Sequence, residues 1–204
     1  MPKLEFFFDC SSPWTYLAFV GIRPIVERHK LTIDWRPILV GGVFNVVNKD
    51  LYAGREAMFN NPRRLTYFMK DLQDWARYRN ITINWPDFHP VNSVKAMRGC
   101  FVADQHGVLI DYMEAVFRAY WEANDDISSD SVLGRIAREC DMDSRDFLDK
   151  ITQQTYKDAL RANTDELIDR GAYGSPTLFI DGDDMYFGND RLPLVEARLA
   201  NHSG

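Results

Sequence analysis

The order of the apolar patterns along the chain constrains its fold most, because they are strand-like at both ends and helix-like between them. Leu4–Asp9 is a short apolar and aromatic run that is typical of a buried strand. Helical spacing follows over Trp14–His29, where Pro24 is expected to kink the helix or end it early. Thr32–Ile38 predicts a second strand. A strand, a helix and a strand in this order imply a parallel pair joined by a crossover.

The middle of the chain is helical in pattern. Gly41 and Gly42 are expected to begin a loop, and Asn61-Pro62 is a helix start signal before apolar residues at helical spacing. The later helical segments are expected at Ser93–Gln105, at Val108–Glu122, from a cap at Ser128 or Ser129 to about Cys140, from a cap at Asp143 or Ser144 to about Gln153, and at Thr155–Arg170.

Strand signals return after Gly171. Thr177–Ile180 and Met185–Phe187 are separated by a turn signal, and a last helix is expected after the capping candidates Asn189 and Asp190. The whole chain therefore predicts an α/β fold: a thioredoxin-like core (β-α-β … β-β-α) with a large all-helical insertion. We expect residues 1–39 and 173–204 to form the core and residues 40–172 to form the insertion.

Charge and hydropathy argue against several classes of partner. The net charge of the 204 residues is -6 with no basic stripe, so nucleic acid is not an expected partner. No apolar run approaches the roughly 20 residues that span a bilayer, and the first residues lack the pattern of a secretory signal. We therefore expect no membrane partner and a cytoplasmic location.

Cysteine and histidine usage argues against a disulfide framework and a metal site. Cys10, Cys100 and Cys140 are far apart in the sequence, with no C-x-x-C, which is simplest to explain by a reducing compartment. The four histidines are scattered, so no metal site is predicted.

The first candidate site segment is Ser12-Pro13-Trp14-Thr15, between the first strand and the first helix. Redox enzymes with a thioredoxin-like fold carry C-x-x-C at this junction, where the helix N-terminus favours a thiolate. Ser12 holds the first cysteine position and Thr15 the second, and neither can form a disulfide. A serine hydroxyl can instead donate a hydrogen bond to a ligand's thiolate. A plain N-cap explains the motif about equally well.

Two further segments are expected to face that junction. In Gly174-Ser175-Pro176-Thr177 the proline precedes a strand, as a typically cis proline does in this fold, and Ser175 can offer its backbone to a cysteinyl peptide such as glutathione. In Gly188-Asn189-Asp190-Arg191 the helix start could hold a γ-glutamyl carboxylate while Asp190 accepts from its ammonium group. An ordinary turn and ordinary capping explain either segment alone better, but the three together predict one site.

The chain also resembles a known family along nearly its whole length. The matching segments are FFFDCSSPWTYLAF, NPRRLTYFMKDLQDWARYRNITINWP, YWEANDDISSDSVL and GSPTLFIDGDDMYFGNDRL. They resemble the 2-hydroxychromene-2-carboxylate isomerases and the related kappa class glutathione transferases, whose fold is of the DsbA type.

The resemblance implies glutathione as cofactor, with the serine at position 12 bonded to its sulfur. The catalytic residue is then Ser12, and the residues that bind glutathione are Asn48, Arg64, Ser175, Pro176, Gly188, Asn189 and Asp190. Trp14, Trp85, Phe88 and Asn92 are candidates for contact with an aromatic substrate. The resemblance further implies a homodimer and the interconversion of 2-hydroxychromene-2-carboxylate and trans-o-hydroxybenzylidenepyruvate.

Three alternatives to this isomerase stay open. A kappa-class-like glutathione transferase would use the same thiolate on electrophiles. A DsbA-like thiol–disulfide oxidoreductase needs a thiolate on the protein, against which Ser12 and Thr15 argue. A glutathione or peptide binder without catalysis would use the same cradle. Cys10 is expected to be a small buried residue, with a mixed disulfide as the less favoured reading.

Overall fold

The computed structural model describes residues 2–47, 49–50, 54 and 60–200. Within them, β1 (Leu4–Phe8), β2 (Ile33–Pro37), β3 (Thr177–Ile180) and β4 (Asp184–Phe187) form a four-stranded sheet in the order β2-β1-β3-β4. β2 runs parallel to β1, whereas β3 is antiparallel to both β1 and β4. The predicted α/β fold class is confirmed, and so is each of the four predicted strands.

The central strand β1 is apolar throughout because both of its faces are covered. Phe6 and Phe8 belong to the main hydrophobic core, whereas Phe7 packs in a second, smaller core with Phe179 and Leu167. This alternation is the period of two that an extended backbone imposes on its side chains.

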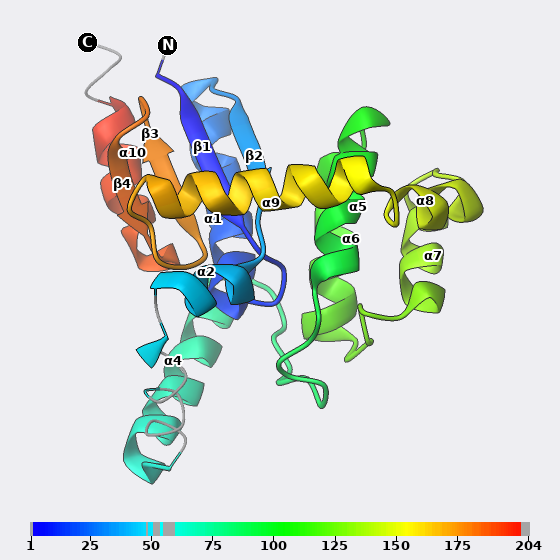
Figure 1. Ribbon diagram of the computed structural model, residues 1–204. Helices are drawn as coiled ribbons and strands as arrows, with labels where there is room; N and C mark the ends of the chain where they lie inside the picture. Colours follow the sequence, from blue (N-terminus) through cyan, green and yellow to red (C-terminus); the bar gives the residue numbers. More distant parts are fainter. Residues whose placement is uncertain (1, 48, 51–53, 55–59, 201–204) are drawn as a thin grey trace.

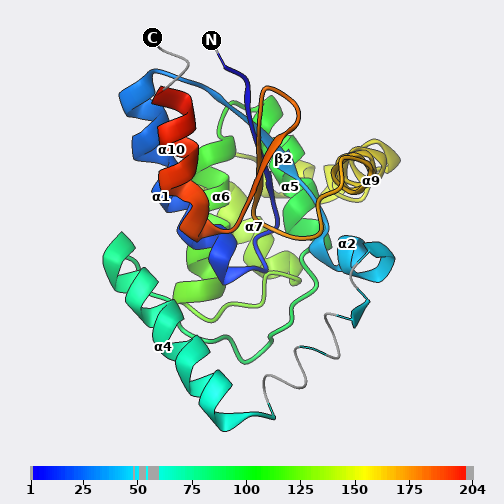
Figure 2. The same ribbon diagram turned by 90° about the vertical axis from the view of Figure 1, so that its left-hand side faces the viewer.

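Helices cover the two faces of the sheet. α1 (Pro13–His29) and α10 (Leu192–Ala200) lie side by side on one face, and α9 (Gln154–Asp169) crosses the other (Figures 1 and 2). α10 follows a short 3-10 turn, η2 (Asn189–Arg191). α9 covers the sheet, although it lies within residues 40–172, which were expected to form the insertion. The division of the chain into a core and an insertion therefore stays a prediction.

The remaining helical segments lie beside the sheet and below it, as Figure 1 is drawn. They are α2 (Val40–Val47), α4 (Pro62–Arg79), α5 (Val94–Gln105), α6 (Leu109–Phe117), the π-helical turn η1 (Arg118–Glu122), α7 (Asp130–Glu139) and α8 (Ser144–Lys150). None of the described helices has the length and apolar character to cross a membrane.

Several helix boundaries agree with the sequence signals, and three expectations need a correction in part or in full. Asn61 and Asp143 cap α4 and α8 through their side chains, as expected. Pro24 does not end α1, which continues to His29 because buried residues on both sides of the proline anchor it. At α7, Ser129 occupies the N-cap position but makes no capping hydrogen bond with its side chain.

The third correction concerns Gly41 and Gly42, which lie in α2 and do not begin a loop. The Val40 N–H at the start of α2 donates to Asp9 Oδ2 at 2.9 Å, so a carboxylate supplies the cap that the local sequence lacks. Gly42 also faces Thr164 of α9, whose methyl group would lie 3.4 Å from an added Cβ. A tertiary contact thus offsets the poor helix propensity of two glycines.

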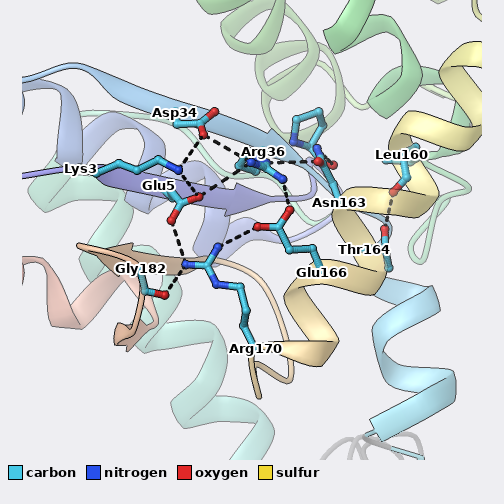
Figure 3. A network of polar contacts seen from close by, with 11 residues as sticks. Lys3, Glu5, Asp34, Arg36, Leu160, Asn163, Thr164, Glu166, Arg170 and Gly182 are labelled. Carbon is cyan, nitrogen blue, oxygen red and sulfur yellow. Dashed lines mark hydrogen bonds and ion pairs between the residues drawn. The ribbon is translucent and has the colours of Figure 1, made fainter.

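A network of charges joins the sheet to α9 (Figure 3). Its centre is Glu5 of β1, which is buried and pairs with Lys3 at 3.0 Å and Arg170 at 2.8 Å. Arg36 of β2 pairs with Glu166 of α9 in the same network. Burial by itself raises the pKa of Glu5, but the hydrogen bonds from Arg170 and Lys3 outweigh it and hold the pKa below its ordinary value.

We expect Glu5→Gln to lower the free energy of unfolding at pH 7 by about 1–3 kcal/mol, because it removes the buried charge that pairs with Lys3 and Arg170 and, of the residues that the structure describes, leaves Arg170 with the carboxylate of Glu166 alone. The pKa of Glu5 is lower in the folded state than in the unfolded state. The stabilisation is therefore complete above the unfolded-state pKa of about 4.3 and is lost as the pH falls through the folded-state pKa. Denaturant unfolding at pH 7 and at lower pH measures the difference.

The control is Glu139→Gln, which removes an exposed partner of Arg135 on α7. This substitution should lower the free energy of unfolding by no more than about 0.5 kcal/mol. Equal losses for the two variants at pH 7 would contradict a stabilising role of the Glu5 network.

Candidate functional site

The junction between β1 and α1 places the start of a long helix at the wall of a cavity. Ser12 has extended backbone angles, φ -101° and ψ 123°, and its Oγ accepts from the Thr15 N–H at 3.3 Å, which is the geometry of an N-cap. Pro13 occupies the first turn. In α1, which is described in full, the first turn carries no acidic side chain, so nothing there offsets the positive end of the helix dipole.

The loop before β3 is joined to this junction by side-chain hydrogen bonds. The Ser175–Pro176 peptide bond is cis, as predicted. Ser175 Oγ accepts from the Asp9 N–H at 2.9 Å and lies 2.8 Å from Thr15 Oγ1. Ser12 Oγ donates to the Ser175 carbonyl at 3.3 Å. Two segments more than 160 residues apart in the sequence are thus held in contact.

Asp9 fixes the site from beneath, and the sequence reasoning overlooked it. Its side chain is fully buried, and Oδ1 accepts from the Ser11 N–H at 2.9 Å. Oδ2 accepts from the Val40 N–H at 2.9 Å and from Ser93 Oγ at 3.0 Å, at the starts of α2 and α5. Burial raises the pKa of Asp9 against these hydrogen bonds. An acidic residue directly after a buried strand is the signal that could have revealed it.

Two adjoining cavities open at the junction, of about 620 Å³ and about 360 Å³. Trp14, Ser175 and Phe187 line both, so these three residues mark the boundary between them. Ser12 lines the larger cavity only. The helix start and the loop of the cis proline therefore lie where the two cavities meet.

The larger cavity has an aromatic wall. Trp14, Phe68 and Trp85 follow one another in edge-to-face contacts, with ring centroids 5.8 and 5.9 Å apart, and His89 lies 4.6 Å beyond Trp85. Among the predicted substrate contacts, Trp14, Trp85 and Asn92 line this cavity. Phe88 does not: its side chain is 48% exposed, and it lines none of the cavities among the described residues. The sequence did not single out Phe68 or His89.

The smaller cavity contains the third predicted segment. Gly188, Asn189 and Asp190 line it, together with Asp71 and Trp75 of α4, which sequence reasoning did not assign to a site. Asn189 is 2% exposed, and its Oδ1 is buried without a hydrogen-bond partner. A buried acceptor that lacks a partner costs free energy unless a ligand or a water supplies a donor.

Two predicted cofactor contacts are not brought to these cavities. Asn48 lies outside the described residues. Arg64 is exposed in the first turn of α4, and it is absent from the residues that line the described cavities.

The three cysteines are unsuited to redox chemistry. All are buried and unpaired. Burial raises the pKa of Cys10 well above its ordinary value, with the charge of Asp9 adding to the effect, and burial raises the pKa of Cys140 to about 11. Cys10 is the small buried residue that was expected, with its carbonyl bonded to the Trp121 Nε1–H at 2.8 Å. The described residues include no cluster of side chains that could hold a metal ion.

Comparison with known proteins found a matching domain model and similar enzymes. A model of the DSBA-like thioredoxin domain matches residues 3–200. The chain is 26% identical to a 2-hydroxychromene-2-carboxylate isomerase of Pseudomonas putida over 96% of this chain and 93% of that protein. It is also 26% identical to human glutathione S-transferase kappa 1, over 94% of this chain and 88% of that protein.

Solved structures also resemble this chain over nearly its whole length. A crystallised 2-hydroxychromene-2-carboxylate isomerase superimposes with a TM-score of 0.83 at 25% identity, over 98% of this chain and 96% of that one. A probable DsbA oxidoreductase of Streptomyces coelicolor superimposes with a TM-score of 0.78 at 14% identity, which shows the shared fold alone.

Proposed function

The chain belongs to the family of DSBA-like thioredoxin domains, and we propose that it is a glutathione-dependent isomerase of 2-hydroxychromene-2-carboxylate. The observation that carries the proposal is the position of Ser12, a partly buried hydroxyl at the start of α1 beside the meeting point of two cavities. The isomerase and kappa transferase relatives support it.

The smaller cavity fits the γ-glutamyl end of glutathione. The partnerless Asn189 Oδ1 can accept from a ligand N–H, and Asp190 supplies a carboxylate for an ammonium group. The N–H groups at the start of η2 and α10 can hold a carboxylate. The donors and acceptors of the cavity thus match the two charges of an amino acid end.

Ser12 and Ser175 would hold the cysteinyl part. In this structure the Ser12 hydroxyl donates to the Ser175 carbonyl at a long 3.3 Å. A bound cysteinyl residue can replace this hydrogen bond with two others. Its N–H can donate to the Ser175 carbonyl, and its sulfur can accept from the Ser12 hydroxyl. The Ser175 side chain stays tied to Asp9 and Thr15, so the loop keeps its position during this exchange.

Glutathione, when bound, supplies a nucleophilic thiolate that the protein itself lacks. Ser12 and the positive end of α1 stabilise negative charge at that position, which lowers the pKa of a thiol there. The wall of Trp14, Phe68 and Trp85 orients a flat aromatic substrate and excludes water. Asn92, which also lines this cavity, offers polar atoms for the substrate's oxygens.

The experiment is a spectrophotometric assay of 2-hydroxychromene-2-carboxylate with the protein, with and without glutathione. We expect trans-o-hydroxybenzylidenepyruvate to form faster only when both are present, with the total thiol concentration unchanged at the end. The absence of acceleration would refute isomerisation of this substrate.

A kappa-class-like transferase is the second candidate, favoured by the similarity to the kappa enzymes. It predicts that one thiol is consumed for each product molecule when an aryl halide is offered as electrophile. Tight glutathione binding without turnover in either assay would instead identify a non-catalytic binder.

A further inference from the structure

A third cavity, of about 490 Å³, lies between α2, α5 and α9. It adjoins the larger cavity with the aromatic wall, which is called the aromatic cavity below. Leu39, Gly42 and Val94 line both the third and the aromatic cavity and so form the wall between them. Ser12 and Ser175 do not reach the third cavity. Its volume is within the range of small-molecule sites, about 300–1,000 Å³.

Arg98 of α5 enters this cavity with its charge unmatched. Within the described part of the chain its guanidinium makes no hydrogen bond or ion pair, and its Nε is buried without an acceptor. Burial lowers the pKa of Arg98, which records the cost of its desolvation. Arg98 as a whole is only partly buried, but its buried N–H is unfavourable unless a ligand or a water supplies an acceptor.

The other residues that line the cavity include charged groups of both signs on α9 and several apolar side chains. Lys157 and Arg161, one turn apart on α9, line the same cavity, and neither has an ion pair in the described part of the chain. Asp158 and Asp165 also line it, and like Arg161 they are exposed, where solvent screens charge; Arg98 and Lys157 are the partly buried charges of the cavity, and both are cationic. The apolar lining comes from Leu39, Val46, Val94, Leu160 and Ile168.

We propose that this cavity binds a small organic carboxylate, with the acid group on Arg98 and an apolar body against the surrounding aliphatic side chains. The planar guanidinium of arginine pairs with a carboxylate through two parallel hydrogen bonds. An inorganic anion would satisfy Arg98 but would leave the apolar walls without a contact. The ligand is therefore expected to carry one negative charge on a hydrocarbon body.

The test is equilibrium binding of hexanoate, measured by calorimetry, to the wild-type chain and to Arg98→Met. We expect saturable binding to the wild type and an affinity at least about tenfold lower in the variant, because the charge-assisted hydrogen bonds are lost. Arg98→Lys, which keeps the charge without the fork, should fall between them. Arg145→Met, the same substitution at an exposed position of α8, is the control and should bind as the wild type does.

Five further measurements keep the proposal separate from the candidate active site and from folding. Excess glutathione and Ser12→Ala should leave hexanoate binding unchanged. Hexanamide and inorganic phosphate should each bind more weakly than hexanoate, and Arg98→Met should unfold at a temperature no lower than the wild type. Displacement of hexanoate by glutathione, equal binding of inorganic phosphate, or unchanged affinity in Arg98→Met would each overturn the proposal.

Discussion

Replacing Ser12 with alanine should lower the glutathione-dependent rate at pH 7 by about 10- to 100-fold. A hydrogen bond to a charged group contributes about 1.5–3 kcal/mol, and a pKa shift of one unit corresponds to 1.36 kcal/mol. Losing the Ser12 hydroxyl should therefore raise the pKa of a bound thiol by about one to two units. Near neutral pH the thiolate fraction, and the rate with it, falls by the same factor.

The pH dependence gives the sign of this effect. A thiol with a raised pKa is more often protonated, so the loss has its full size below the pKa of the thiol bound to the wild type and disappears above its pKa in the variant. The pH–rate profile and the ultraviolet absorbance of the bound thiolate should both shift to higher pH.

Ser11→Ala is the matched control, since Ser11 lines the same cavity but contributes only its backbone N–H to the hydrogen bonds described. Ser12→Ala also removes an N-cap worth about 1 kcal/mol, so rates are compared below the unfolding transition of both variants. An unchanged pH profile in Ser12→Ala would show that the hydroxyl does no more than cap α1.

Gly188→Ala should weaken glutathione binding by about 5- to 100-fold. Gly188 has φ 105° and ψ 155°, a conformation that is essentially restricted to glycine and costs other residues about 1–3 kcal/mol. An alanine Cβ would also lie 2.7 Å from Asp190 Oδ1. To relieve this strain, the backbone of the variant has to shift. The shift displaces Asn189 and Asp190 from their positions in the wall of the smaller cavity. Calorimetric titration with glutathione measures the loss.

Gly182→Ala separates binding from stability. Gly182 also has a positive φ, 99°, but no atom outside its immediate neighbours lies within 4 Å of an added Cβ, and the residue lines none of the described cavities. Both variants should unfold at lower temperature than the wild type, whereas only Gly188→Ala should lose affinity. Equal glutathione affinities in the two variants would refute a role for the Gly188 segment in binding.

Much of the fold was predictable because its signals are local. The apolar run of β1, the Asn61-Pro62 start of α4 and the Asp143 cap of α8 each depend on residues adjacent in sequence. The three segments at Ser12, Ser175 and Asn189 were also recognisable, since each combines a turn with a helix or strand end. Their order along the chain matched the places where this fold brings loops together.

The wrong predictions had tertiary causes. Pro24 and the glycines of α2 lower helix propensity by themselves, yet burial of α1 and the contact of Gly42 with α9 preserve both helices. Phe88 is aromatic and adjoins a loop, but it is 48% exposed and lies outside the three cavities described, so its contact with a substrate stays a prediction.

The sequence by itself determined most of the elements, their order and the presence of Ser12 where redox enzymes of this fold carry a cysteine. Only the tertiary structure decided which polar groups are buried and what they face. Asp9 holds the starts of two helices that follow it by 31 and 84 residues, and Arg98 is left without an acceptor. Burial and pairing depend on contacts between residues distant in sequence, so a local pattern can mark a candidate such as Asp9 but does not give its partners.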